Sequence, residues 1–281
     1  MKIVFSEKCL EYNFPGHPES SSRVKNVYDF LKQKNIFEFI EPLPASEEDV
    51  LKTHNPELIE KIKKGGFLDA DTFNAEKMFD YALLSVGAAV KAQELAFENG
   101  SAFSLMRPPG HHAQKNQAGG FCYFNNITVA VLKALEKIQK IAIIDIDVHH
   151  GNGTEDIFFG DERVLFVSLH QSPFYPGTGL VSKKNCLNFP LPPMTGESLY
   201  FQTLEKAIKE IKKFSPQMLA VSAGFDTYRE DPLADFNLEK DSYKTIAEMI
   251  FSLKKPCFSV LEGGYSKELP ECVFSYLSGI I

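Results

Sequence analysis

Two acidic residues and one histidine have the types and the placement of ligands for a divalent metal. Asp147 and His149 are two residues apart after the apolar run 141–146, and at the end of a strand this spacing would put both side chains on one face. Asp226 follows another apolar run, 218–222. Two carboxylates and one imidazole leave a fourth position open, which is typical of catalytic rather than structural zinc. We therefore expect these three residues to bind one catalytic Zn²⁺ ion.

Two other interpretations of these residues deserve comparison. Asp147 and Asp226 could each cap a helix, with His149 an ordinary loop residue, but the joint occurrence of all three after strands argues against this. A site with two metals would need further carboxylates around the Asp-x-His motif. Gly151 stands where one of them would be expected, which favours a single metal.

A pair of adjacent histidines supplies candidate acid–base groups. His111 and His112 follow the Pro-Pro-Gly turn at 108–110. A neutral imidazole can take a proton from water, and a protonated one can give it to a leaving amine. Such a ring needs its other nitrogen held, and Asp145 is suited to hold one of the two. Asn152 could hold the other and, being neutral, would orient the ring without raising its basicity. The alternative for the pair is a surface loop.

Tyr265 is the candidate for stabilising negative charge in the reaction. It follows Gly263 and Gly264, which leave its backbone free to bring the phenol over a metal. A phenol there could donate a hydrogen bond to the oxyanion of a tetrahedral intermediate. The alternative is a tight turn against which the ring packs.

The order of elements indicates where these residues meet. Short apolar runs alternate with segments of helical periodicity. The runs are 3–5, 102–105, 141–146, 164–169, 218–222 and 258–261, and the helical segments are 20–34, 76–98, 125–138, 198–213 and 240–253. This alternation predicts an α/β fold with a parallel sheet and helices on both faces. Ligands bind beyond the carboxyl ends of such strands, and five of the seven histidines follow strand ends.

Composition narrows the setting. No repeat or linker divides residues 1–281, so we expect one domain. The net charge of −7 without a basic run argues against nucleic acid as a partner. No apolar stretch approaches the length of a membrane span, and the charged N-terminus does not resemble a signal peptide. The five cysteines are scattered without a Cys-x-x-Cys pair, which predicts no disulfides and a cytoplasmic location.

Six motifs, in order along the chain, resemble those of the histone deacetylase superfamily. They are Arg-Pro-Pro-Gly-His-His at 107–112, Gly-Gly-Phe-Cys-Tyr-Phe-Asn-Asn at 119–126, Asp-Ile-Asp-Val-His-His-Gly-Asn-Gly-Thr at 145–154, Tyr-Pro-Gly-Thr-Gly at 175–179, Ser-Ala-Gly-Phe-Asp at 222–226 and Glu-Gly-Gly-Tyr at 262–265. The resemblance is greatest to class II and bacterial members, including acetylpolyamine amidohydrolases, and His-Pro-Glu at 17–19 also fits that branch. It covers nearly the whole chain. It implies the single-domain arginase–deacetylase fold, with an eight-stranded parallel sheet flanked by helices.

The resemblance also implies roles for individual residues. It gives the zinc to the three ligands already named. His112 would be the general base and proton shuttle, and His111 a protonated partner of Asp145. Tyr265 would be the oxyanion donor. A structural monovalent cation, normally K⁺, would be held largely by backbone carbonyls of Asp145, Asp147, His149, Ser168 and Leu169.

The substrate channel is implied in the same way. Its walls would be Gly120, Phe121, Phe174 and Tyr175. Asp71 matches a rim carboxylate that holds the substrate backbone, although it could instead cap the helix 76–98. Arg23 aligns with a residue of an inner cavity for acetate release. The chain is shorter than most members and lacks obvious rim insertions.

The substrate itself stays open between two amides. Leu233 occupies the gatekeeper position at the channel mouth, and an apolar residue there suits an acyl-lysine stem or a small acylated amine. The run 224–232 resembles the polyamine branch, so an acetylpolyamine is the alternative. A third interpretation is a non-catalytic module that binds acyl-lysine. The histidine pair and Tyr265 argue against it, because a binding module needs no general base.

Overall fold

Eight parallel strands form the centre of the fold. The structure is a computed structural model that describes residues 1–281. The strands are β1 (Lys2–Val4), β2 (Glu38–Ile40), β3 (Ser101–Ser104), β4 (Ile141–Asp145), β5 (Val164–Gln171), β6 (Cys186–Leu191), β7 (Met218–Ala223) and β8 (Cys257–Leu261). They pair in the order β2-β1-β3-β8-β7-β4-β5-β6, and every pairing is parallel. This confirms the predicted eight-stranded parallel sheet.

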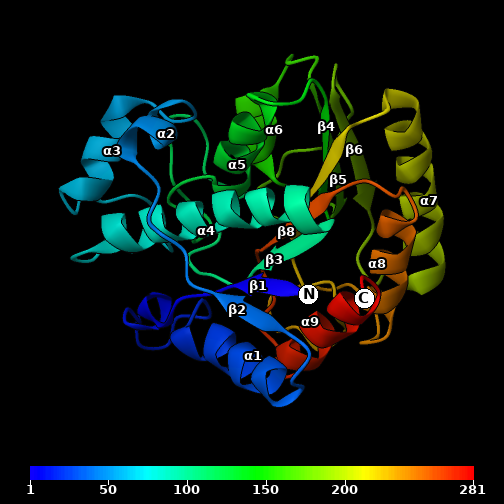
Figure 1. Cartoon of the computed structure of the whole chain (residues 1–281), viewed down its shortest axis with the longest axis horizontal. Coiled ribbons are helices and arrows are strands. Elements are labelled where there is room, and N and C mark those ends of the chain that lie inside the picture. Colours follow the sequence, from blue (N-terminus) through cyan, green and yellow to red (C-terminus); the bar gives the residue numbers. More distant parts are fainter.

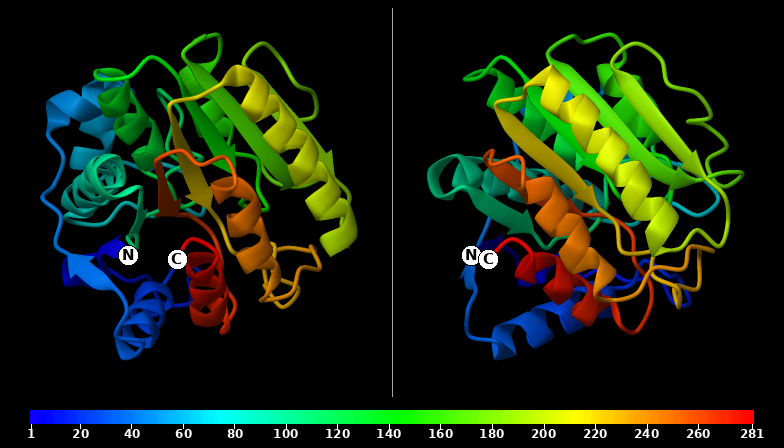
Figure 2. Two further views of the ribbon diagram at one scale, coloured as in Figure 1. Left: turned by 45° about the vertical axis from the view of Figure 1, so that its right-hand side comes forward. Right: turned by 90° about the vertical axis from the view of Figure 1, so that its right-hand side faces the viewer.

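Helices cover both faces of the sheet (Figures 1 and 2). They are α1 (Ser21–Gln33), α2 (Glu47–Leu51), α3 (Pro56–Lys63), α4 (Met78–Asn99), α5 (Asn126–Leu135), α6 (Asn152–Phe158), α7 (Glu197–Phe214), α8 (Ser242–Phe251) and α9 (Leu269–Ser278), with a short 3₁₀ helix at Glu7–Leu10. Helices α1, α9, α8 and α7 pack side by side on one face, and α4, α5 and α6 on the other. No helix has both the length and the apolar character needed to cross a bilayer.

The central strands are buried along their whole length. Every residue of β4, β5, β7 and β8 lies in the core. These strands are predominantly apolar because a parallel sheet with helices on both faces has no solvent side. Their carboxyl ends are therefore fixed by packing on two faces, which suits them to hold functional side chains in defined positions.

The order in which the chain adds strands explains how distant motifs meet. After β3 the chain skips the space of two strands to place β4, and then adds β5 and β6 outward to the edge. It later returns to place β7 and β8 between β4 and β3. The loops that follow β3, β4, β7 and β8 therefore share one edge of the sheet. That edge is the place where ligands bind in open α/β sheets.

The sequence patterns located most of these elements. All six apolar runs fall in strands and all five periodic segments in helices, with differences of a few residues at their ends. The patterns did not predict β2 and β6, the two edge strands, or the short helices α2, α3 and α6. Strand β6 contains Pro190, which has no N–H to donate and is tolerated because β6 lies at an edge.

Asp147 and His149 do not lie on a strand, although their spacing predicted it. Strand β4 ends at Asp145, so Asp147 and His149 lie in the loop beyond it. Alternation along a strand therefore does not bring their side chains together. Direct contacts between the two residues do so instead.

Helix α4 crosses the segment before α2 at close range. The N–H of Ala45 donates to the carbonyl of Leu83 at 2.9 Å. A Cβ atom added to Gly87 would lie 1.9 Å from the carbonyl oxygen of Leu43 and 2.8 Å from the nitrogen of Ala45. Glycine at this position permits backbone-to-backbone packing that no other residue would allow.

We expect Gly87→Ala to lower the free energy of unfolding by about 1–3 kcal/mol, the usual cost of overpacking. Intrinsic helix propensity alone would favour alanine by roughly 1 kcal/mol, so the sign of the change separates the two effects. Urea denaturation measures it. Glu98→Ala, at an exposed position of the same helix, is the control and should leave the midpoint almost unchanged. A stabilised Gly87→Ala variant would contradict the packing argument.

Candidate active site

Asp147, His149 and Asp226 meet at the carboxyl edge of the sheet. The Nδ1 atom of His149 lies 3.0 Å from Oδ1 of Asp147 and 3.2 Å from Oδ2 of Asp226. One ligand atom from each residue falls within 4.8 Å of the other two. Both carboxylates are buried, and the His149 side chain is 14% exposed. A single imidazole nitrogen thus faces two buried carboxylates.

The chemistry of this group fits a metal cation. Asp226 Oδ2 is buried without a hydrogen-bond partner, whereas its Oδ1 accepts from the N–H of Val148 at 2.9 Å. Asp147 Oδ2 accepts from the N–H of Gly263 at 2.8 Å. Burial and the charge of Asp147 raise the pKa of Asp226 to about 7. A divalent cation would provide a partner for the orphaned oxygen and would offset the repulsion between the carboxylates.

Neither aspartate caps a helix. The residue that caps α6 is Gly151, and the one that caps α8 is Asp241. The helix-cap interpretation of Asp147 and Asp226 is therefore wrong.

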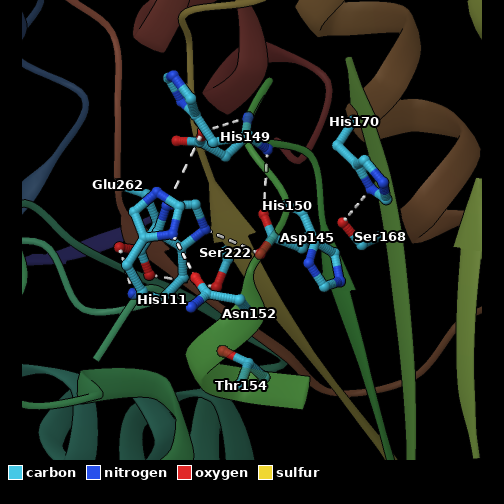
Figure 3. Close-up of polar contacts among 12 residues, drawn as sticks. His111, Asp145, His149, His150, Asn152, Thr154, Ser168, His170, Ser222 and Glu262 are labelled. Carbon is cyan, nitrogen blue, oxygen red and sulfur yellow. Dashed lines mark hydrogen bonds and ion pairs between the residues drawn. The ribbon is translucent and has the colours of Figure 1, made fainter. Parts of the chain in front are cut away.

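The two adjacent histidines are held by the residues that the sequence suggested. His111 Nδ1 lies 3.0 Å from Asp145 Oδ2 (Figure 3). His112 Nδ1 lies 2.8 Å from Asn152 Oδ1. Burial opposes the charge on His111, but Asp145 and Asp147 outweigh it and raise its pKa to about 10. Burial and the charge of His111 hold the pKa of His112 well below its usual value. Near neutral pH the adjacent pair thus has one protonated imidazole, that of His111, and one neutral imidazole, that of His112.

A narrow cavity of about 270 Å³ leads to these groups. Its lining includes the proposed channel residues Asp71, Gly120, Phe121, Phe174, Tyr175 and Leu233, together with His111, His112, Asp147, His149 and Tyr265. The Phe174 ring stacks on His149 at 5.1 Å between centroids, and Phe121 meets Tyr265 edge-on at 5.9 Å. The channel is therefore aromatic along its walls and polar at its floor.

Two channel residues have clear conformational reasons for their place. Gly120 has a φ of +57°, and a Cβ there would lie 2.5 Å from Cδ2 of His112 and 3.0 Å from the hydroxyl of Tyr175. Only glycine leaves room for both rings. Asp71 lies at the mouth and does not cap α4, because that helix begins at Met78 after Lys77.

A larger cavity of about 630 Å³ adjoins the channel and shares His112 and Tyr175 with it. It is open to solvent, and none of the three candidate metal ligands lines it. Two of the candidate ligands, Asp147 and His149, line the smaller cavity instead, so the candidate active site is assigned to it.

Arg23 lies behind the channel rather than in its wall. It is buried, and its guanidinium stacks over the Tyr265 ring at 4.5 Å. It donates to the carbonyls of Gly264 at 2.6 Å and Glu262 at 2.8 Å. It also pairs with Glu19, which accepts two further bonds from the fully buried Arg107. Arg23 thus supports the segment that carries Tyr265.

Ser168 and Leu169 lie next to Asp145. Strands β4 and β5 pair in a register that sets Asp145 opposite Ser168, and both β5 residues are fully buried. The Ser168 hydroxyl lies 2.9 Å from Nδ1 of His170.

Sequence reasoning missed two buried acids that hold backbone in the site. Glu262 accepts hydrogen bonds from the N–H groups of Gly110 and His111, and Asp231 accepts from the N–H of Tyr265 at 2.6 Å. For Glu262 a signal existed, since a carboxylate directly after the predominantly apolar strand β8 is itself expected to be buried, and buried carboxylates are rare. Asp231 lies in a polar loop segment, where an acidic residue is ordinary.

The match to known proteins decides the family. Residues 17–280 match the model of the histone deacetylase domain. This chain belongs to the histone deacetylase family. It is 39% identical to a probable deacetylase of Archaeoglobus fulgidus, over 95% of this chain and 81% of that protein. It is 36% identical to the histone deacetylase-like amidohydrolase of Pseudomonas aeruginosa, over 94% of this chain and 78% of that protein.

A solved structure extends the likeness to three dimensions. The acetylpolyamine aminohydrolase from Burkholderia pseudomallei superposes with a TM-score of 0.93 at 25% identity, covering 99% of this chain and 98% of that one. The predicted superfamily, its bacterial branch and the fold are thereby confirmed. Family membership makes this histone deacetylase-like chain a hydrolase of the deacetylase and amidohydrolase type.

Gly263 offers a test of the candidate metal site. A Cβ there would lie 2.1 Å from Asp226 Oδ2 and 2.6 Å from Asp147 Oδ2. We expect Gly263→Ala to displace both carboxylates and to weaken Zn²⁺ binding by roughly 10–100-fold, the scale seen when the support of metal ligands is altered. Competition with a fluorescent chelator measures the affinity. Gly196→Ala is the matched control, because its nearest neighbour would be 4.0 Å away. Equal affinities in the two variants would count against a metal at this position.

Proposed function

We propose that this chain is a zinc-dependent deacetylase that hydrolyses the amide of an acyl-lysine side chain or of a small acylated amine. One observation carries the proposal. The three candidate metal-ligand atoms lie close together, and two of the residues that carry them, Asp147 and His149, line a single narrow channel beside two imidazoles of opposite protonation state. Hydrolysis of an unactivated amide requires this combination of an electrophile, a base and an acid.

Asp147, His149 and Asp226 would hold the zinc ion. When bound, the ion supplies Lewis acidity toward a water molecule and the carbonyl of the substrate. A structural K⁺ would lie nearby, held by Asp145, Asp147, His149, Ser168 and Leu169. Its proposed role is to offset part of the negative charge of the buried carboxylates.

His112 would act as the general base. Asn152 Oδ1 can only accept a hydrogen bond, so Nδ1 of His112 carries the proton and Nε2 is free to take one from water. The same nitrogen would then deliver that proton to the leaving amine. His111, protonated beside Asp145, would keep His112 neutral before the reaction.

Tyr265 would donate a hydrogen bond to the oxyanion. Burial raises the pKa of its phenol well above its ordinary value, so the hydroxyl keeps its proton. Asp231 fixes its backbone and Arg23 supports its ring. A donor held in advance stabilises the developing charge without reorganising during the reaction.

The channel supports a substrate with a straight aliphatic stem. Phe121, Phe174 and Tyr175 provide apolar walls, and Leu233 adds an apolar residue at the mouth. Asp71 at the rim would receive the substrate backbone. Arg23 would contribute by supporting Tyr265, and its role in acetate release is part of the same proposal.

The second candidate is an acetylpolyamine amidohydrolase. Its support is the likeness of the whole chain to the Burkholderia pseudomallei enzyme of that name. A non-catalytic acyl-lysine binding module is the remaining alternative, and the complete set of acid–base groups argues against it.

A panel of acetyl-lysine peptides and N-acetylated polyamines tests the proposal. We expect kcat/KM to be higher for the peptides, activity to be lost with a chelator, and Zn²⁺ to restore it. Higher kcat/KM for acetylated polyamines would favour the second candidate. One zinc per chain with no hydrolysis of any acyl amine would favour the binding module.

We expect Tyr265→Phe to lower kcat roughly a hundredfold, the scale for loss of one oxyanion donor, with zinc content unchanged. The phenylalanine ring keeps its packing against Phe121 and Arg23, so only the hydroxyl is removed. Steady-state kinetics and metal analysis measure the two effects. Tyr81→Phe, whose hydroxyl contacts Glu11 away from the channel, is the control. A normal rate in Tyr265→Phe would remove the tyrosine from the mechanism.

A further inference from the structure

Glu262 is a fully buried carboxylate without a basic ion-pair partner. It follows the last residue of β8, and neither lysine nor arginine forms a salt bridge with it. Its Oε2 accepts hydrogen bonds from the N–H groups of Gly110 at 2.7 Å and His111 at 3.2 Å. Its Oε1 accepts from the Ser222 hydroxyl at 3.2 Å. Figure 3 shows Glu262 and Ser222 beside His111. Burying such a group is costly, so its contacts need an explanation.

The N–H groups of Gly110 and His111, which donate to Glu262, have no other acceptor in the structure. They belong to the turn that carries both histidines. A buried N–H left without a partner is itself costly. The turn therefore depends on this one side chain for its backbone hydrogen bonds on that side.

The main chain after Glu262 is held just as firmly. The N–H of Gly263 donates to Asp147, and the carbonyls of Glu262 and Gly264 accept from Arg23. The N–H of Tyr265 donates to Asp231, in the loop after β7. The carboxylate of Glu262 thus joins this fixed segment to the turn that bears His112.

We propose that Glu262 is a positioning residue that sets the place of His112 relative to Tyr265 and the metal ligands. This inference rests on the proposed function, because the relative position matters only if these groups act on one substrate. Glu262 lines no part of the channel and would act through the backbone of the histidine turn. The required property is the reach of one acceptor oxygen, Oε2, to both N–H groups, and not the negative charge.

Two substitutions separate the length of the Glu262 side chain from its negative charge. Glu262→Gln keeps the length: its carbonyl oxygen can accept from Gly110 and His111, and its amide can donate to the Ser222 hydroxyl. Glu262→Asp keeps the charge but is one methylene shorter. A shift of the catalytic groups by about 1 Å can cost on the order of a hundredfold in rate.

We expect Glu262→Asp to lower kcat roughly tenfold to a hundredfold with KM nearly unchanged. Glu262→Gln should stay within about threefold of the wild type, because its hydrogen bonds are retained. Amide hydrogen exchange gives a readout that does not depend on turnover. The amides of Gly110 and His111 should exchange faster in Glu262→Asp and at the wild-type rate in Glu262→Gln. Ser222→Ala, which removes only the bond to Oε1, should leave both amides protected.

Each outcome of these experiments either supports or overturns the positioning role of Glu262. Wild-type kcat in Glu262→Asp, or equal losses in the two variants, would overturn the positioning role. Slow hydrolysis by Glu262→Asp with unchanged exchange at Gly110 and His111 would also overturn it. If Glu262→Asp fails to fold, retained activity and protection in Glu262→Gln support the proposal, and their loss refutes it. If the wild-type chain hydrolyses no acyl amine, the proposed function fails first, and exchange still shows whether Glu262 holds the turn.

Discussion

Negative charge concentrated in a dry interior is the constraint around which this site is built. Asp145, Asp147, Asp226 and Glu262 are all fully buried at one edge of the sheet. Isolated carboxylates in such a place are strongly unfavourable unless they are paired or satisfied by hydrogen bonds. Backbone N–H groups satisfy part of this demand, and the His111 imidazolium offsets one charge. The remaining excess of negative charge is what suits the site to a bound cation.

The fold creates this concentration by its strand order. The chain completes β3 through β6 before β7 and β8 enter the middle of the sheet. The loops after these two strands place Asp226 and Glu262 between the histidine turn, which follows β3, and Asp147, which follows β4. Because the central strands are buried on both faces, the acids cannot move apart to relieve their repulsion. Protonation or a bound cation is the remaining way to relieve it.

The sequence carried much of this information, but unevenly. The candidate metal ligands were predicted from residue type and from their place after apolar runs, and the tethers of the two histidines from the need to hold a ring nitrogen. The channel residues came only from the family resemblance, since aromatic residues in loops have no periodic pattern. Glu262 and Asp231 were missed because each binds the backbone of a turn distant in the sequence. Such contacts depend on which loops the topology brings together, and local patterns do not encode that.

The stacking of Phe174 on His149 couples the wall of the channel to the candidate metal site. The Phe174 ring forms part of the wall of the cavity and at the same time packs against the imidazole of His149. In the proposed enzyme, the position of the Phe174 ring would therefore affect two equilibria, binding of the substrate and binding of the metal ion. Coupling between two binding equilibria is reciprocal. If a bound substrate raised the affinity for the metal ion by some factor, the bound ion would raise the affinity for the substrate by the same factor. The loop between β5 and β6 is in this sense a shared component of both equilibria.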